Sequence, residues 1–229
     1  MLLALLIAEL GWREALWFLA LLVGVLFPSL SYLFLRDKPE DIGLFADGGA
    51  PGTDQIPEEA PNKTLGEARR SPIFWLYTAS LGIHALFGTA LTFHIVSIFE
   101  EAGRSREEAF FYFVPAAVFS TLVNLSASTI VDRYPLRPFQ ITMLIAFTVG
   151  AIGLLNLDTE WGFWFLAGGF GTGAGLWGVI SSFAFIRFYG PLHLGEISGF
   201  NTSVTVFASA IGPAAVSYTH LTLPPILLV

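Results

Sequence analysis

Six long stretches of the chain contain no Asp, Glu, Lys or Arg, and charged residues occur only in the gaps between them. These stretches are residues 15–35, 71–99, 109–131, 138–157, 161–186 and 197–229. A bilayer-spanning helix needs roughly 17–25 apolar residues, so each stretch fits one helix, the last with a tail. A membrane barrel would instead need short alternating strands. The pattern predicts an all-α membrane protein with about six transmembrane helices plus, in residues 2–8, the end of another.

The composition supports this prediction and narrows the functional class. The chain is 54% hydrophobic and 13% charged, whereas a soluble domain carries about 25% charged residues. A net charge of −7 argues against nucleic acid as a partner. There is no cysteine, and no hydrolase, metalloprotease or phosphate-loop motif. We therefore predict no enzyme activity, no cofactor and no metal site.

One hydrophilic segment, residues 36–72, separates the first apolar stretch from the others. It holds 13 of the 29 charged residues and is rich in Pro, Gly, Asp and Glu, which predicts a largely disordered linker. Its end, residues 64–72, is expected to form a short amphipathic helix. If the linker is cytoplasmic, eight Lys and Arg residues lie on that side and three on the other. The excess of positive charge therefore predicts a cytoplasmic linker.

In four of the predicted spans, polar or small residues recur at intervals of about four and seven residues. Residues at these intervals lie on the same face of an α-helix. These faces are Tyr77, Ser80, His84 and Gly88; Ala117, Ser120, Asn124 and Ser128; Gly168, Gly171, Gly175, Gly178 and Ser182; and Asn201, Thr205, Ala208 and Gly212. Residues 138–157 are poorer in such groups. The pattern predicts a water-filled cavity lined by four helices, with the fifth facing lipid.

The candidate cavity residues are His84, Asn124 and Asn201, with Tyr77 and Gly175 as further candidates. An imidazole titrates near neutral pH, so His84 is the candidate carrier of a coupling proton. The alternative is a neutral histidine bonded to a neighbouring helix. For the two asparagines the alternative is a hydrogen bond between helices, and for Gly175 it is close helix packing.

Three other features of the spans have structural interpretations. Gly169-x-x-x-Gly173 and Gly171-x-x-x-Gly175 are patterns that predict close packing between helices. Arg187, at the end of its span, is expected to extend to the membrane interface as an anchor.

The turn Asp132-Arg133-Tyr134-Pro135-Leu136-Arg137 resembles the D-R-x-x-x-R turn between the eighth and ninth helices of major facilitator superfamily transporters. Further stretches resemble other loops of that family: Gly11-Trp12-Arg13, residues 36–41, 186–190 and 193–199, and Ala210-Ile211-Gly212-Pro213. Together they resemble the bacterial relatives of monocarboxylate and oxalate–formate transporters.

The resemblance implies a partial major facilitator fold. Residues 1–35 would form the end of helix 5 and helix 6, residues 36–72 the central cytoplasmic loop, and residues 73–216 helices 7 to 11. It implies a multi-pass protein of the bacterial inner membrane. This protein would move a small solute, with an organic anion as the candidate, by alternating access and with a proton as candidate coupling ion. Gating would involve Asp132, Arg133 and Arg137.

Both ends of the sequence carry expectations of their own. Met1 is interpreted as an internal start. Residues 217–229 resemble translated adaptor sequence and are expected to be non-native, the alternative being a real, divergent terminus. The alternative functions are a non-transporting membrane protein, such as a sensor or scaffold, and a fragment without function.

Overall fold

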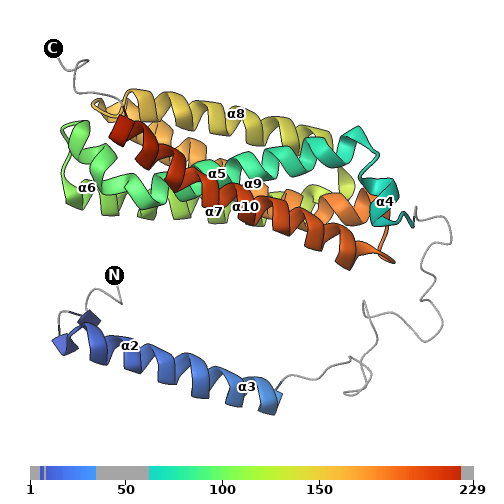
Figure 1. Cartoon of the computed structure of the whole chain (residues 1–229), viewed down its shortest axis with the longest axis horizontal. Coiled ribbons are helices and arrows are strands. Elements are labelled where there is room, and N and C mark those ends of the chain that lie inside the picture. The colour runs from blue at the N-terminus through green and yellow to red at the C-terminus, as the bar shows by residue number, and fades with distance from the viewer. Residues whose placement is uncertain (1–5, 8, 35–61, 223–229) are drawn as a thin grey trace. The chain divides into compact units, whose positions relative to one another are not determined.

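The computed structural model describes residues 6–7, 9–34 and 62–222, and every regular element in these ranges is a helix. The chain divides into two units, Met1–Glu58 and Glu59–Val229 (Figure 1). Residues 36–61 of the predicted linker lie outside the described residues, as do residues 223–229 of the predicted tail.

The first unit contains one continuous helix made of α2 (Trp12–Leu21), η1 (Leu22–Leu26) and α3 (Phe27–Phe34). The middle segment is a π-helical turn, in which the Phe27 N–H donates to the Leu22 carbonyl five residues earlier. We attribute this turn to Pro28, which has no N–H and cannot continue the regular ladder. The helix agrees with the predicted span at residues 15–35.

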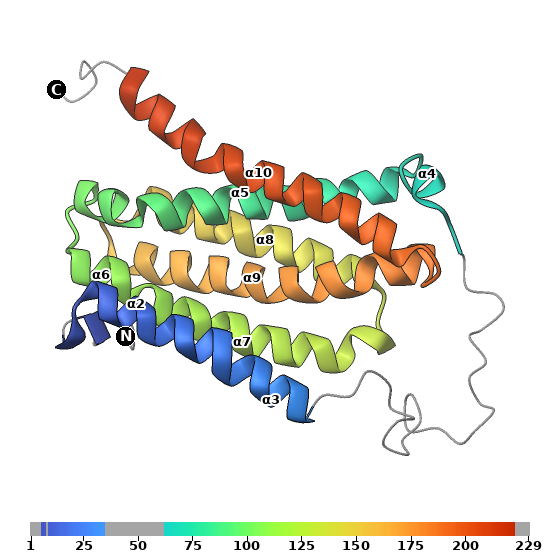
Figure 2. The same ribbon diagram turned by 60° about the horizontal axis from the view of Figure 1, so that its bottom comes forward.

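The second unit is a bundle of long helices that run side by side. Its elements are α4 (Leu65–Ala68), α5 (Pro72–Glu101), α6 (Arg106–Phe111), α7 (Phe113–Ile130), η4 (Val131–Arg133), α8 (Leu136–Leu155), α9 (Glu160–Tyr189) and α10 (Leu194–Thr222). Helix α9 is the central member, because α5, α7, α8 and α10 all contact it (Figure 2). The predicted helices are confirmed, with ends that differ by a few residues.

The glycines of α9 allow its neighbours to approach closely on two sides. A Cβ atom at Gly169 would overlap the backbone of α8 at Ala146 and Gly150. A Cβ atom at Gly175 would overlap the backbone of α7 at Ser120. The two small-residue patterns therefore mediate helix packing, as predicted, with one face for α8 and the other for α7.

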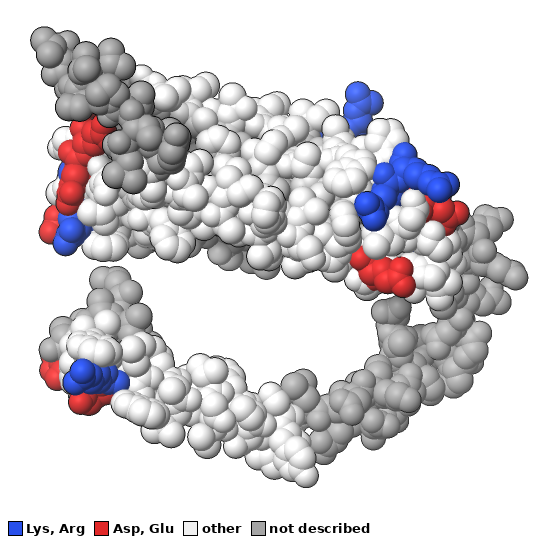
Figure 3. Space-filling view, viewed as in Figure 1, with Lys and Arg blue, Asp and Glu red and all other residues white. Residues whose placement is uncertain are grey.

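Five of the described helices are long and apolar enough to cross a membrane. They are Trp12–Phe34, Pro72–Glu101, Arg106–Arg133, Leu136–Leu155 and Glu160–Tyr189. The sixth predicted span forms helix α10 but is not among them, because hydroxyl and amide side chains lower its hydropathy. In the second unit the charged side chains gather at the two ends of the bundle and leave an uncharged band between them (Figure 3).

The predicted short helix before α5 is confirmed as α4, and its first turn is capped from both sides. The Thr64 N–H donates to Glu67 Oε2 at 2.8 Å, and the Glu67 N–H donates to Thr64 Oγ1 at 3.4 Å. The hydrogen bond from the Thr64 backbone, with that from its side chain, lowers the pKa of the Glu67 carboxyl. Trp75 donates its indole N–H to the Arg69 carbonyl at 2.8 Å and so ties α4 to α5.

Candidate functional site

Two clusters of buried apolar side chains occupy opposite ends of the second unit. One includes Phe74 and Leu81 of α5, and the other includes Leu91 and Phe99 of the same helix. His84 lies on α5 between these two sets. Two cavities open beside this part of α5, and Ala85 lines both.

The first cavity, here called the α7 cavity, is bounded by α5, α7 and α9 and has a volume of about 450 Å³. Its wall is mostly apolar, with hydroxyl groups from Thr89, Thr92 and Ser120. His84 lines it, with its ring stacked on Phe147 of α8 at a centroid distance of 4.5 Å. Nδ1 of His84 is buried and has no hydrogen-bond partner among the described residues.

The second cavity, here called the α10 cavity, is bounded by α5, α9 and α10 and has a volume of about 380 Å³. Asn201 lines it and is only 6% exposed. The Oδ1 atom of this side chain is buried and, within the described part of the chain, accepts no hydrogen bond. His84 and Asn201, two of the predicted cavity residues, thus each line a cavity, and their binding of a solute stays a prediction.

Trp177 and Ala85 line both cavities and so form the partition between them. Trp177 donates its indole N–H to the Leu81 carbonyl at 3.2 Å, which fixes the ring against α5. Its ring centroid lies 5.5 Å from that of His84. Sequence reasoning missed Trp177, because an aromatic residue within an apolar span gives no signal that separates it from lipid-facing ones.

The other predicted cavity residues lie at contacts between helices. Asn124 of α7 donates its Nδ2–H to the Gly175 carbonyl of α9 at 3.1 Å, which corresponds to the alternative foreseen for both residues. Tyr77 is buried at one end of the bundle, with its ring 5.4 Å from that of Phe188. None of these three lines the α7 or the α10 cavity.

Helix α8 contributes no lining residue to either cavity, which agrees with its expected position outside the cavity wall. It nevertheless carries a buried polar contact that sequence reasoning missed. Gln140 donates to Ser80 Oγ of α5 at 2.6 Å, and Ser80 in turn donates to the Tyr77 carbonyl at 2.9 Å. Part of the polar face predicted for α5 therefore serves packing against α8.

The turn that contains Asp132, Arg133 and Arg137 is held by a residue from another helix. Arg187, at the end of α9, donates to the Tyr134 carbonyl at 2.7 Å and to the Val131 carbonyl at 2.8 Å. Its Nη2 atom also lies 3.9 Å from Asp132 Oδ1. Arg187 is therefore more than the interface anchor that we predicted, since it joins the α7–α8 turn to α9.

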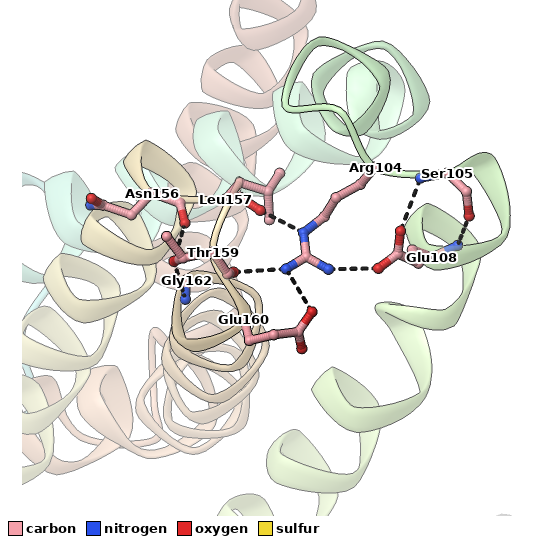
Figure 4. A network of polar contacts seen from close by, with 8 residues as sticks. All are labelled: Arg104, Ser105, Glu108, Asn156, Leu157, Thr159, Glu160 and Gly162. Atoms are coloured by element: carbon pink, nitrogen blue, oxygen red, sulfur yellow. Dashed lines mark hydrogen bonds and ion pairs between the residues drawn. The ribbon is translucent and has the colours of Figure 1, made fainter.

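A second arginine network closes the opposite end of the bundle (Figure 4). Arg104 donates to the carbonyls of Leu157 and Thr159, and it pairs with Glu108 Oε1 at 2.6 Å and Glu160 Oε1 at 3.3 Å. These contacts join the loop after α5 to the loop before α9. From the sequence, Arg104 is only one of the three basic residues predicted on the side opposite the linker.

The comparison with known protein families agrees with the helical membrane fold of the structure. The sequence matches the model of the Major Facilitator Superfamily over residues 1–213 of its 229. Neither the curated proteins nor the solved structures gave a match. The family consists of integral membrane transporters that move small solutes. With its bundle of apolar helices and a match over nearly its whole length, this chain belongs to the major facilitator superfamily.

Proposed function

We propose that the protein carries a small organic anion, as a monocarboxylate-like solute, by alternating access, and that the solute binds at His84 and Asn201. The observation that supports this is the pair of buried polar atoms without described partners, His84 Nδ1 and Asn201 Oδ1, each on a cavity wall. A buried polar group without a partner costs about 1–3 kcal/mol. A solute that bonds to either atom would recover that free energy.

His84 is also the group through which an anion and a proton would be coupled. Among the described side chains that line the α7 cavity, it is the one that can bind a proton and so become positively charged. A protonated imidazole attracts a carboxylate, and the carboxylate in turn favours the protonated imidazole. Anion and proton would then move together, as in symport.

We further propose that the α7–α8 turn with Asp132, Arg133 and Arg137 is part of the gate at the cytoplasmic side. The contacts of Arg187 support this, because they join the turn between α7 and α8 to the end of α9. Helix ends joined in this way would move together when the cavity opens.

The proposal is tested by uptake into proteoliposomes at a series of external pH values. For the unaltered protein we expect uptake of a radiolabelled monocarboxylate to rise as the external pH falls. His84→Gln keeps a hydrogen-bonding side chain but cannot bind a proton, so its uptake should not vary with pH.

His94→Gln is the matched control, since His94 lies on the same helix but lines neither cavity. It should keep the pH dependence of the unaltered protein. A pH profile that is unchanged in His84→Gln would exclude His84 as the proton carrier.

A further inference from the structure

The α10 cavity is unusual in how its wall presents hydrogen-bonding groups. Its polar lining consists of Ser181, Ser198, Asn201, Thr202, Thr205 and Ser209. Among the residues that the structure describes, no Lys, Arg, His, Asp or Glu lines it. The cavity is therefore polar but carries no formal charge.

Most of these hydroxyl groups donate their single proton to their own helix. Thr202 donates to the Ser198 carbonyl at 2.8 Å, Thr205 to the Asn201 carbonyl at 2.8 Å, and Ser209 to the Val206 carbonyl at 2.7 Å. A hydroxyl whose proton is engaged in this way offers only its oxygen lone pairs to a ligand.

Groups on α9 complete the same pattern. Ser181 donates to the Gly178 carbonyl at 2.9 Å, and Trp177 donates its N–H to the Leu81 carbonyl at 3.2 Å. Asn201 adds the buried Oδ1 atom that accepts no hydrogen bond within the described residues. The remaining donors of the wall are the Asn201 Nδ2–H groups and the Ser198 hydroxyl, so acceptors outnumber donors and a ligand that donates hydrogen bonds is favoured.

Three kinds of solute group can be compared against such a wall. A carboxylate has no proton to donate and would face the lone pairs of the wall. An ammonium group can donate, but it would lose water without gaining a counter-charge, which is costly. An uncharged hydroxyl group donates at little desolvation cost and can accept from the remaining donors.

From this arrangement we infer that the solute carries several hydroxyl groups, which bind in the α10 cavity against Asn201, Thr205 and their neighbours. This inference rests on the proposed function, and it specifies the class of the solute as a hydroxylated organic anion.

The test compares propionate with glycerate, which has the same carboxylate and chain length and two additional hydroxyl groups. Binding of each to the purified chain is measured by isothermal titration calorimetry. We expect glycerate to bind at least fivefold more tightly than propionate, since one net hydrogen bond corresponds to about a fivefold change in affinity.

Thr205→Val removes one acceptor oxygen and keeps the shape of the side chain. It should weaken glycerate binding about fivefold and leave propionate binding unchanged. Thr148→Val is the matched control, because Thr148 of α8 makes the same kind of bond, to the Leu144 carbonyl at 2.9 Å, but does not line the cavity.

The outcomes separate this inference from the proposed function. Equal affinities for propionate and glycerate, or equal weakening of both by Thr205→Val, would overturn the inference and leave anion transport standing. Failure of both compounds to bind would contradict the proposed function itself, and the inference with it.

Discussion

Two arginines at the junction of α5 and α6 show how strongly the surroundings of a residue determine its contribution to stability. The side chain of Arg104 is 8% exposed and reaches two carbonyl groups and two carboxylates. The side chain of Arg106 is 65% exposed, and its Nε atom lies 3.8 Å from Glu100 Oε1. A buried hydrogen-bonding group that loses its partner is costly, whereas an exposed ion pair contributes little. The two positions should therefore differ greatly in their effect on stability.

We expect Arg104→Met to lower the free energy of unfolding by about 2–4 kcal/mol, because the Leu157 and Thr159 carbonyls and Glu108 lose their donor. Arg106→Met should change it by less than about 0.5 kcal/mol. The free energy of unfolding of both variants is measured by titration with SDS, with the loss of the helical circular dichroism signal as the readout. Similar effects of the two substitutions would show that the Arg104 network is not stabilising.

At the scale of the element, the glycines of helix α9 determine how closely its neighbours α7 and α8 can pack. Gly169 and Gly173 face α8, while Gly171 and Gly175 face α7. Close approach of backbones gains dispersion contacts that helices in lipid need, because no hydrophobic effect drives them together. Glycine in a helix interior is otherwise unfavourable by about 1 kcal/mol relative to alanine. Whether a glycine-to-alanine substitution raises or lowers the free energy of unfolding should therefore depend on how close the neighbouring helix lies.

Gly175→Ala and Gly199→Ala should act in opposite directions. A Cβ at Gly175 would meet the Ser120 carbonyl oxygen at 2.5 Å, so we expect the free energy of unfolding to fall by about 1–3 kcal/mol. A Cβ at Gly199 of α10 would meet nothing within 4 Å. That substitution should stabilise by about 0.5–1 kcal/mol, from helix propensity alone. The same SDS unfolding assay measures both variants. Destabilisation by both substitutions would contradict the expected dependence on the neighbouring helix.

At the scale of the whole molecule, the bundle of the second unit is closed at each end by an arginine. Arg104 joins the loop after α5 to the loop before α9, and Arg187 joins the α7–α8 turn to the end of α9. Alternating access moves groups of helices as bodies around a central site. Contacts of this kind keep helix ends together during such movement.

Arg187→Met should loosen the α7–α8 turn, since the carbonyls of Val131 and Tyr134 lose their donor. We expect faster hydrogen–deuterium exchange in residues 131–137 and a lower maximal uptake rate at unchanged apparent affinity. Asp132→Asn should have little effect on exchange, because Asp132 is exposed and 3.9 Å from Arg187. Equal exchange in the two variants would contradict this role for Arg187.

The sequence predicted the helices more accurately than the site. Spans at 71–99 and 161–186 correspond to Pro72–Glu101 and Glu160–Tyr189, because a charge-free stretch of that length has few alternatives to a helix in lipid. Of the five predicted cavity residues, His84 and Asn201 line cavities, while Tyr77, Asn124 and Gly175 contact neighbouring helices. The spacing of residues predicts which of them share a helix face, but it does not predict whether that face contacts a cavity or another helix.

By itself, the sequence determined the helical class, the approximate helix bounds, the small-residue packing patterns of α9 and the short helix before α5. These properties depend on residues near one another in the chain, through backbone hydrogen bonding and hydropathy. Only the tertiary structure decided that Arg187 holds the α7–α8 turn and that Trp177 separates two cavities. Such contacts join residues on different helices, and they exist only once the helices have selected their neighbours by packing.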